Sequence, residues 1–262
     1  MDASVAGLYH FSEKVKWPRI VMAFARVQVS SDSALFIVRA MLTLYHLWLS
    51  PFCRKVRVAL AEKGVDFSLA VEKVWERREG FVELNPACEV PVLVEADGTV
   101  LADSNAICEY LEETRPDNRL IGFDPYVRAE TRRLIAWFDM KFDSEVSRYL
   151  IEEKFMKRFM AMGEPDSQAI RAGSSNIGYH LEYIAYLIER RKWLAGDEFS
   201  LADIAAGAHL SSMDYLGVIP WEDYPAAKDW YARIKSRPSF RALLLDNIPG
   251  LSPPKHYADL DF

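Results

Sequence analysis

The feature that most constrains the fold is a change of hydrophobic period near the middle of the 262-residue chain. Before it, short apolar runs stand beside turn signals, as in stretch 42–46 (LTLYH) and in stretch 91–103, a hairpin pattern around Asp97-Gly98. After Pro125, apolar residues recur at steps of three and four, which is typical of amphipathic helices. Strands followed by a run of helices indicate an α/β domain joined to an all-helical domain.

The element order can be predicted within this frame. Residues 41–114 predict the order β-α-β, an irregular stretch, and then β-β-α. Pro51 stands where the first turn of a helix tolerates proline, and Gly64 closes that helix. Stretch 115–125 has two prolines, a glycine and no period, so we predict that it links the first domain to a helical domain at 126–246.

Both ends of the chain differ from these two domains. Residues 1–40 have short apolar patches, no consistent period and no secretory signal. We expect them to lie outside the fold, either untranslated, with synthesis starting at Met41, or disordered. Near the other end, Pro253 and Pro254 cannot continue a helix, so we expect residues 247–262 to leave the domain as an extended tail.

The composition of this tail indicates a binding role. Two aromatic residues, Tyr257 and Phe262, alternate with Asp259, Asp261 and the terminal carboxylate. A peptide of this kind can bind as a short linear motif, and we predict that these four residues bind a partner. The alternative is a disordered end, or one packed back on the domain.

Charge and cysteine content exclude several classes of protein. A net charge of -6 and a pI near 5.5 argue against general nucleic-acid binding. No apolar run reaches the roughly 18 residues that span a bilayer, so we predict no membrane insertion. Three irregularly spaced cysteines predict neither a disulfide framework nor a metal site, which favours a cytoplasmic protein. Ser50 takes the place of the first thiol of a CxxC motif before Cys53, so we predict no dithiol chemistry.

Four stretches together indicate a family. In chain order they are SPFCRKVRVALAEKG, NPACEVPVLV, LADSNAICEYLEE and WLAGDEFSLADIAAGAHL. They resemble the cytosolic glutathione S-transferases over nearly all of residues 41–246. The resemblance implies an α/β thioredoxin-like N-terminal domain followed by an all-α C-terminal domain, and a homodimer. It does not by itself imply catalysis.

The resemblance also implies roles for particular residues. In the family, the residue at the position of Ser50 donates a hydrogen bond to the glutathione sulfur. A turn like Val90-Pro91 presents its backbone groups to the cysteinyl part of glutathione. A pair like Asp103-Ser104 holds the γ-glutamyl end. Ser50 precedes a predicted helix N-terminus, which suits a thiolate. The alternative for Ser50 and Ser104 is that each simply caps a helix.

One departure from the family pattern affects this site. Many relatives carry a lysine just before the Val-Pro turn, where it holds the glycine carboxylate of glutathione, but here Glu89 stands in that place. Two facing carboxylates repel each other by on the order of 1 kcal/mol at about 4 Å in water. Lys73 or Arg77 could compensate. The resemblance therefore implies glutathione as a ligand, and Glu89 predicts a weakened site.

Two further stretches resemble a narrower branch of the family, the division proteins that bind the tubulin homologue FtsZ. They are VEKVWERREGFVELNPACEVPVLVE, which contains Trp75, and the tail PGLSPPKHYADLDF. The resemblance implies a cytoplasmic adaptor on FtsZ filaments, recruited to the division site, with weak or no transferase activity. A tryptophan among charged residues is typical of interface hot spots, so we predict that Trp75 binds the partner, the alternative being a ring folded onto the core. The alternative function is an active transferase that conjugates glutathione to small electrophiles, with Ser50 as its catalytic residue.

Overall fold

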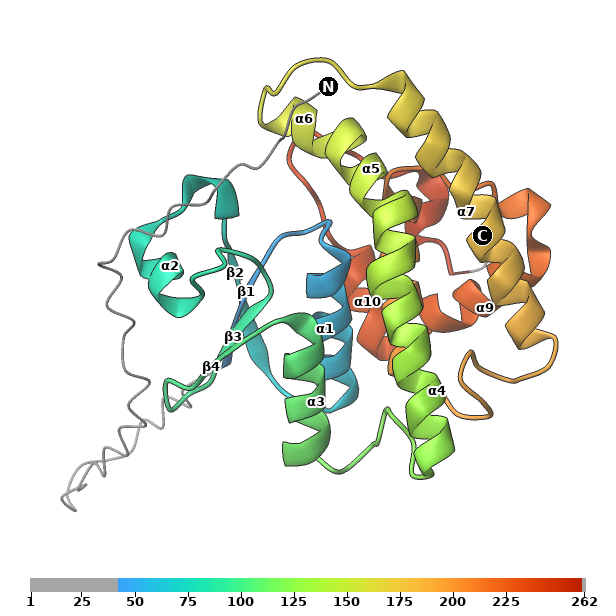
Figure 1. Ribbon diagram of the computed structural model, residues 1–262, viewed down its shortest axis with the longest axis horizontal. Helices are drawn as coiled ribbons and strands as arrows, with labels where there is room; N and C mark the ends of the chain where they lie inside the picture. Colours follow the sequence, from blue (N-terminus) through green and yellow to red (C-terminus); the bar gives the residue numbers. More distant parts are fainter. Residues whose placement is uncertain (1–41, 261–262) are drawn as a thin grey trace, which may run out of the picture. The chain divides into compact units, whose positions relative to one another are not determined.

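The computed structural model describes residues 42–260 (Figure 1). The predictions made for residues 1–40, Asp261 and Phe262 concern positions outside this described range. The described chain begins with a sheet of four strands in the order β2-β1-β3-β4. The strands are β1 (Leu42–His46), β2 (Phe67–Val71), β3 (Val92–Val94) and β4 (Val100–Ala102). β1 runs parallel to β2 and antiparallel to β3, which pairs antiparallel with β4.

Helices cover both faces of this sheet. They are α1 (Pro51–Glu62), the 3₁₀ turn η1 (Val74–Glu76), α2 (Glu79–Leu84) and α3 (Ser104–Thr114). Side chains alternate along a strand, so Leu44 and Leu93 join the core on the side of α1 and α3. Val92 faces the other way and packs in a smaller cluster with Phe81 of α2. In Figure 1, α2 accordingly lies across the sheet from α1 and α3.

The second half of the described chain is helical. Its elements are α4 (Pro125–Ala136), the π-helical η2 (Trp137–Ser147), α5 (Arg148–Ile151), the π-helical η3 (Glu152–Met156), α6 (Lys157–Phe159), α7 (Ser167–Ile188), α8 (Leu201–Tyr215), the 3₁₀ turn η4 (Trp221–Asp223), α9 (Pro225–Lys235), α10 (Pro238–Leu244) and the 3₁₀ turn η5 (Lys255–Ala258). The thioredoxin-like sheet followed by helices confirms the predicted fold class. Every residue of α8 is buried, which makes it the centre of the helical part.

The elements from α4 to α6 follow one another without a break and form one long helix at 125–159 (Figure 1). Phe138, Phe142, Val146 and Leu150 recur every four residues along it, and each is fully buried. An α-helix turns about 100° per residue, so a four-residue repeat would drift by about 40° at each step. The wider π-helical turns offset that drift and keep the apolar face toward the core.

Helix α1 joins the sheet to the helical part through buried charges. Arg54, Lys55 and Arg57 are all buried on this helix. Arg57 donates two hydrogen bonds to Asp246, at 2.7 and 2.8 Å, and Lys55 pairs with Asp139 of η2. A buried cation without its partner is strongly unfavourable, so these pairs fix the position of α1 against the helices.

The C-terminal segment packs on the domain instead of leaving it. Tyr257 is 0% exposed and belongs to the main hydrophobic core. Its hydroxyl accepts a hydrogen bond from Arg54 at 2.9 Å and donates one to the Leu243 carbonyl at 3.1 Å. The prediction of an extended tail at 247–262 is therefore wrong for its described part. Tyr257 is buried and its hydroxyl is paired, so in the docked segment it is a packing residue and not the partner-binding side chain that we predicted.

Candidate functional site

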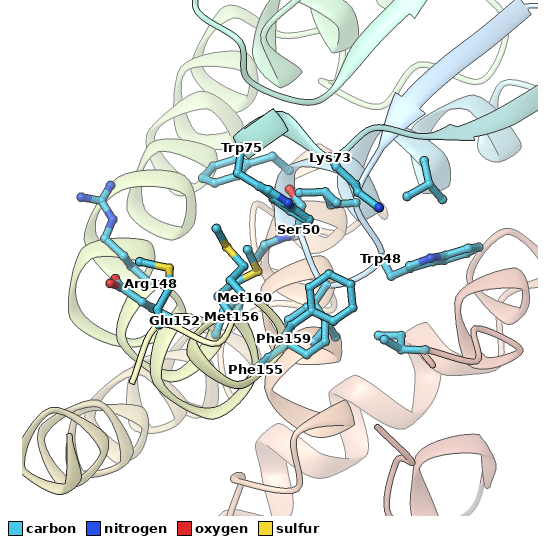
Figure 2. Close-up of a pocket in the computed structure, with 18 of the residues that line it drawn as sticks. Trp48, Ser50, Lys73, Trp75, Arg148, Glu152, Phe155, Met156, Phe159 and Met160 are labelled. Atoms are coloured by element: carbon cyan, nitrogen blue, oxygen red, sulfur yellow. The ribbon is translucent and has the colours of Figure 1, made fainter. Parts of the chain in front are cut away.

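A large pocket lies between the sheet part and the long helix, and we call it the apolar pocket (Figure 2). Its volume is about 640 Å³. Its lining residues come from four segments. They are residues 47–52 after β1, then Val71 at the end of β2 with Lys73 and Trp75 just beyond it, then the face of the long helix and the turn after it from Asp143 to Met162, and finally Ile248 and Pro249. Because these segments are far apart in sequence, the pocket exists only once both parts of the fold have packed together.

Aromatic and methionine side chains form most of the wall. Trp75 is half-buried, and its ring meets Phe159 edge to face with 5.7 Å between centroids. Phe159 stacks in turn on Phe155 at 5.3 Å. Phe159 and Met162 remain 47% and 57% exposed, so the apolar wall is open to solvent. Flexible, polarisable methionines beside rigid aromatics suit a site that adapts to an apolar ligand.

Charged groups stand at the rim of the apolar pocket. Lys73 Nζ lies 3.0 Å from Glu76 Oε1 in an exposed pair. Arg148 Nη2 lies 3.4 Å from Asp143 Oδ2, and its side chain is 70% exposed. The Lys73–Glu76 pair is exposed and contributes little to stability, so Lys73 can exchange partners with a ligand at low cost. Arg148 differs, because its partner Asp143 has a side chain that is only 10% exposed.

Ser50 lies on the wall of the apolar pocket and caps α1. Its Oγ accepts a hydrogen bond from the Cys53 backbone N–H at 3.3 Å. Ser50 is therefore a helix cap, and the cap leaves its hydroxyl proton able to donate to a ligand. The helix N-terminus also gives this position a positive field, so an anionic sulfur is electrostatically acceptable beside Ser50.

A second, smaller pocket adjoins the first, and we call it the polar pocket. Its volume is about 270 Å³. It is lined by Phe52, Asn85, Ala87, Glu89, Val90, Pro91, Ala102, Asp103 and Ser104. The structure thus brings together Val90, Pro91, Asp103 and Ser104 as their roles in the resemblance require, and the Val90-Pro91 bond is cis. Phe52 lines both pockets, whereas Ser50 lines only the apolar one.

The electrostatics of the polar pocket are one-sided. Glu89 and Asp103 line it and are both exposed, and its lining contains no lysine, arginine or histidine. Lys73 lines the apolar pocket instead, and Arg77 lines neither of the two. Neither Lys73 nor Arg77 is therefore in a position in this lining to compensate for the negative charge of Glu89.

Asp103 also occupies the amides that an anion would use at the start of α3. One of its carboxylate oxygens accepts from the N–H groups of Asn105 at 2.7 Å and Ala106 at 3.0 Å. A helix N-terminus binds anions through such N–H groups. Ser104 opens the helix and is 3% exposed. A ligand carboxylate would have to displace Asp103 or use other donors.

The cysteines do not add a reactive group to either pocket. Cys53, Cys88 and Cys108 are free and buried. Burial raises the pKa of Cys53 to about 11 and that of Cys108 to about 12. Across residues 42–260, no group of three or more His, Cys, Asp or Glu could hold a metal ion, and no helix is both long and apolar enough to cross a bilayer.

The sequence predictions named no residue on the helix side of the apolar pocket. Phe155, Met156, Phe159 and Met160 line it from η3, α6 and the turn that follows. They form two apolar pairs four residues apart, within FMKRFM. That spacing places both pairs on one side of a helix and could have revealed the site.

Comparison with known proteins identifies the family. The pattern of the glutathione S-transferase N-terminal domain matches residues 49–114, and that of the C-terminal domain matches residues 148–238. The chain belongs to the glutathione S-transferase family. It is 49% identical over 223 residues to FtsZ-localized protein A of Caulobacter vibrioides, which covers 84% of this chain and 98% of that protein.

Solved structures agree with this assignment. FzlA from C. crescentus superposes with a TM-score of 0.82 at 49% identity, covering 85% of this chain and 100% of that one. A glutathione S-transferase from Rhodospirillum rubrum superposes with a TM-score of 0.84 at 57% identity, with the same coverage. A transferase from Methylobacterium radiotolerans, in complex with glutathione sulfonate, superposes with a TM-score of 0.66 at 29% identity, covering 79% and 97%.

Proposed function

We propose that this protein is a cytoplasmic adaptor that binds FtsZ filaments and regulates bacterial cell division, with weak or no transferase activity. The observation that carries the proposal is the contrast between its two pockets. The apolar pocket is large and open, whereas the polar pocket carries two carboxylates and no base. The 49% identity to FtsZ-localized protein A supports the choice of partner.

The apolar pocket is the proposed docking site for an apolar segment of FtsZ. Trp75 supplies a large, half-buried ring at its edge, and Phe159 and Met162 extend the exposed apolar wall. Buried tryptophans carry much of the binding energy in protein interfaces. Lys73 and Arg148 at the rim would orient the partner by pairing with its acidic groups.

Weak glutathione binding follows from charge. Glutathione carries two carboxylates and one ammonium group. The Asp103 carboxylate can pair with the ammonium group of glutathione. The two glutathione carboxylates, however, would face Glu89 and the N-terminus of α3, where Asp103 already accepts hydrogen bonds from two backbone amides. Each uncompensated contact between carboxylates costs on the order of 1 kcal/mol in water at about 4 Å.

An active glutathione transferase is the second candidate, and one observation favours it. Ser50 stands at the N-terminus of α1 on the wall of the apolar pocket, and Phe52 connects that pocket with the polar one. This is the arrangement needed to hold a thiolate next to an apolar electrophile. Under this alternative, Ser50→Ala would abolish most of the turnover, by about 10–1000-fold, as expected for the loss of one stabilising donor.

Two further features belong to the proposal. The protein is a homodimer, and it reaches the division site through FtsZ. Asp259 is exposed at the end of the described chain, and with Asp261 and Phe262 it forms a terminal motif for a second partner. Tyr257 has no part in that motif, because it is buried.

Co-sedimentation with FtsZ filaments tests the proposed docking site. Trp75→Ala should weaken filament binding by about tenfold or more, because truncation of a hot-spot residue costs about 2 kcal/mol. Tyr186→Ala is the control, because Tyr186 is another aromatic residue that solvent can reach. It is 53% exposed and lies on α7, outside the pocket lining. Equal binding by Trp75→Ala and the wild type would remove the pocket from the interface.

A further inference from the structure

The C-terminal segment forms part of the apolar pocket. We call residues 246–258 the C-terminal strap. Ile248 and Pro249, near its start, line the pocket. The Tyr215 hydroxyl of α8 accepts from the Ile248 N–H at 3.1 Å and donates to the Leu251 carbonyl at 2.9 Å. The first half of the strap is therefore held against the centre of the helical part.

The second half of the strap is anchored by η5. The ring of Tyr257 packs edge to face on Tyr215 with 5.0 Å between centroids. Next to it, His256 Nε2 lies 3.0 Å from Asp214 Oδ1, and Lys235 donates to the His256 carbonyl at 3.0 Å. Docking of the strap thus depends on specific polar contacts as well as on burial of the Tyr257 ring.

One buried side chain contacts both the strap and the pocket wall. The Arg54 Nε donates to the Trp48 carbonyl at 2.7 Å, and its Nη1 donates to the Tyr257 hydroxyl at 2.9 Å and to Ser211 Oγ at 2.9 Å. Trp48 lines the apolar pocket, as Figure 2 shows. Arg54 is fully buried, so it cannot replace a lost partner with water.

We propose that docking of the C-terminal strap and ligand binding in the apolar pocket are coupled through Arg54, with Tyr257 as a positioning residue for the pocket. The guanidinium is planar, so its donors are fixed relative to one another. Loss of the Tyr257 hydroxyl leaves a buried donor without one of its acceptors, which favours reorientation of the group. Reorientation alters the bond to the Trp48 carbonyl and displaces the loop that lines the pocket.

The coupling has a defined consequence for the proposed function, on which it rests for the identity of the ligand. A ligand that binds best when the strap is docked must also hold the strap in place, because linkage between two sites is reciprocal. FtsZ in the apolar pocket would therefore strengthen docking of the strap. A partner that pulls the strap away would loosen FtsZ.

The test uses anilinonaphthalene sulfonate, a fluorescent apolar anion, as the pocket probe. Tyr257→Phe should weaken its binding by about fivefold to thirtyfold, a typical range for coupled sites. The control is Tyr183→Phe, which removes a hydroxyl that also accepts from an arginine, Arg133 at 2.9 Å, but lies outside the pocket lining. Unchanged affinity in Tyr257→Phe, or equal losses in both variants, would overturn the proposal.

Hydrogen exchange on the wild-type protein supplies a readout that does not require a variant to fold. The Tyr257 and Asp259 amides donate to Pro254 and His256 carbonyls, at 3.0 and 3.1 Å. The probe should slow their exchange severalfold, and exchange that is independent of the probe would also overturn the coupling. The same titration with FtsZ filaments separates the two proposals. If the probe slows exchange but the protein does not bind filaments, the coupling stands and the FtsZ function is refuted. If the protein binds filaments but exchange in the strap does not change, the FtsZ function stands and the coupling is refuted.

Discussion

The substitution Glu89→Lys tests the reasoning on the polar pocket. Glu89 is exposed and lines that pocket together with Asp103. A carboxylate of glutathione about 4 Å from Glu89 would be repelled by on the order of 1 kcal/mol, and a lysine would attract it by a similar amount. The full change of about 2 kcal/mol corresponds to roughly thirtyfold in affinity. Screening over a Debye length of about 8 Å reduces it, so we expect a gain of about threefold to thirtyfold.

Titration calorimetry with glutathione at low and high salt measures this gain. The control is Glu83→Lys, which makes the same change of charge at an exposed position of α2 outside the pocket lining. We expect Glu89→Lys alone to bind more tightly and its advantage to shrink at high salt. Equal affinity of Glu89→Lys and the wild type would refute the weakened-site argument. An equal gain in Glu83→Lys would assign the effect to net charge.

Two further predictions concern stability. Asp246→Ala should lower the free energy of unfolding, measured by urea titration, by about 3–5 kcal/mol, because it leaves Arg57 buried without its bidentate partner. A loss below about 1 kcal/mol would mean that the pair is not buried in solution. Burial, helped by the nearby Arg57 charge, lowers the pKa of His46 from 6.5 to about 4, so the folded state binds fewer protons than the unfolded one between these values. Stability should therefore fall as the pH drops below about 6.5, by about 2 kcal/mol at pH 5 from this residue. His180, whose pKa burial also lowers to about 4, adds a similar loss. His46→Phe should remove about half of the combined slope, and an unchanged slope would exclude His46 as a source.

Local signals predicted the N-terminal sheet and its first helix. Pro51 and Gly64 define the ends of α1 through backbone geometry, and the Asp97-Gly98 turn joins β3 to β4. Such signals act within a few residues, so they survive without tertiary context. The stretch predicted to be irregular contains η1 and the six-residue α2. A helix that short shows too little of a period to be recognised from sequence.

Long-range packing explains what the sequence did not show. Pro253 and Pro254 do end the helical pattern. Whether the chain then leaves the domain or packs on it depends on the space that α8, α10 and Arg54 provide for the Tyr257 ring, and Arg54 lies far away in sequence. The family resemblance, which local motifs carry, supplied Val90, Pro91, Asp103 and Ser104 of the polar pocket. Only two of the predicted site residues line the apolar pocket, Ser50 as a catalytic and Trp75 as a partner-binding candidate, since the other walls come from segments far away in sequence.

The central claim is that this family member binds FtsZ in preference to glutathione. The most direct measurement compares two dissociation constants of the wild-type protein, one for FtsZ filaments by co-sedimentation and one for glutathione by calorimetry. We predict a filament dissociation constant of about 10 μM or lower and a glutathione dissociation constant above about 5 mM, a difference of roughly 4 kcal/mol in binding free energy. Micromolar glutathione binding with no protein in the filament pellet would contradict the account.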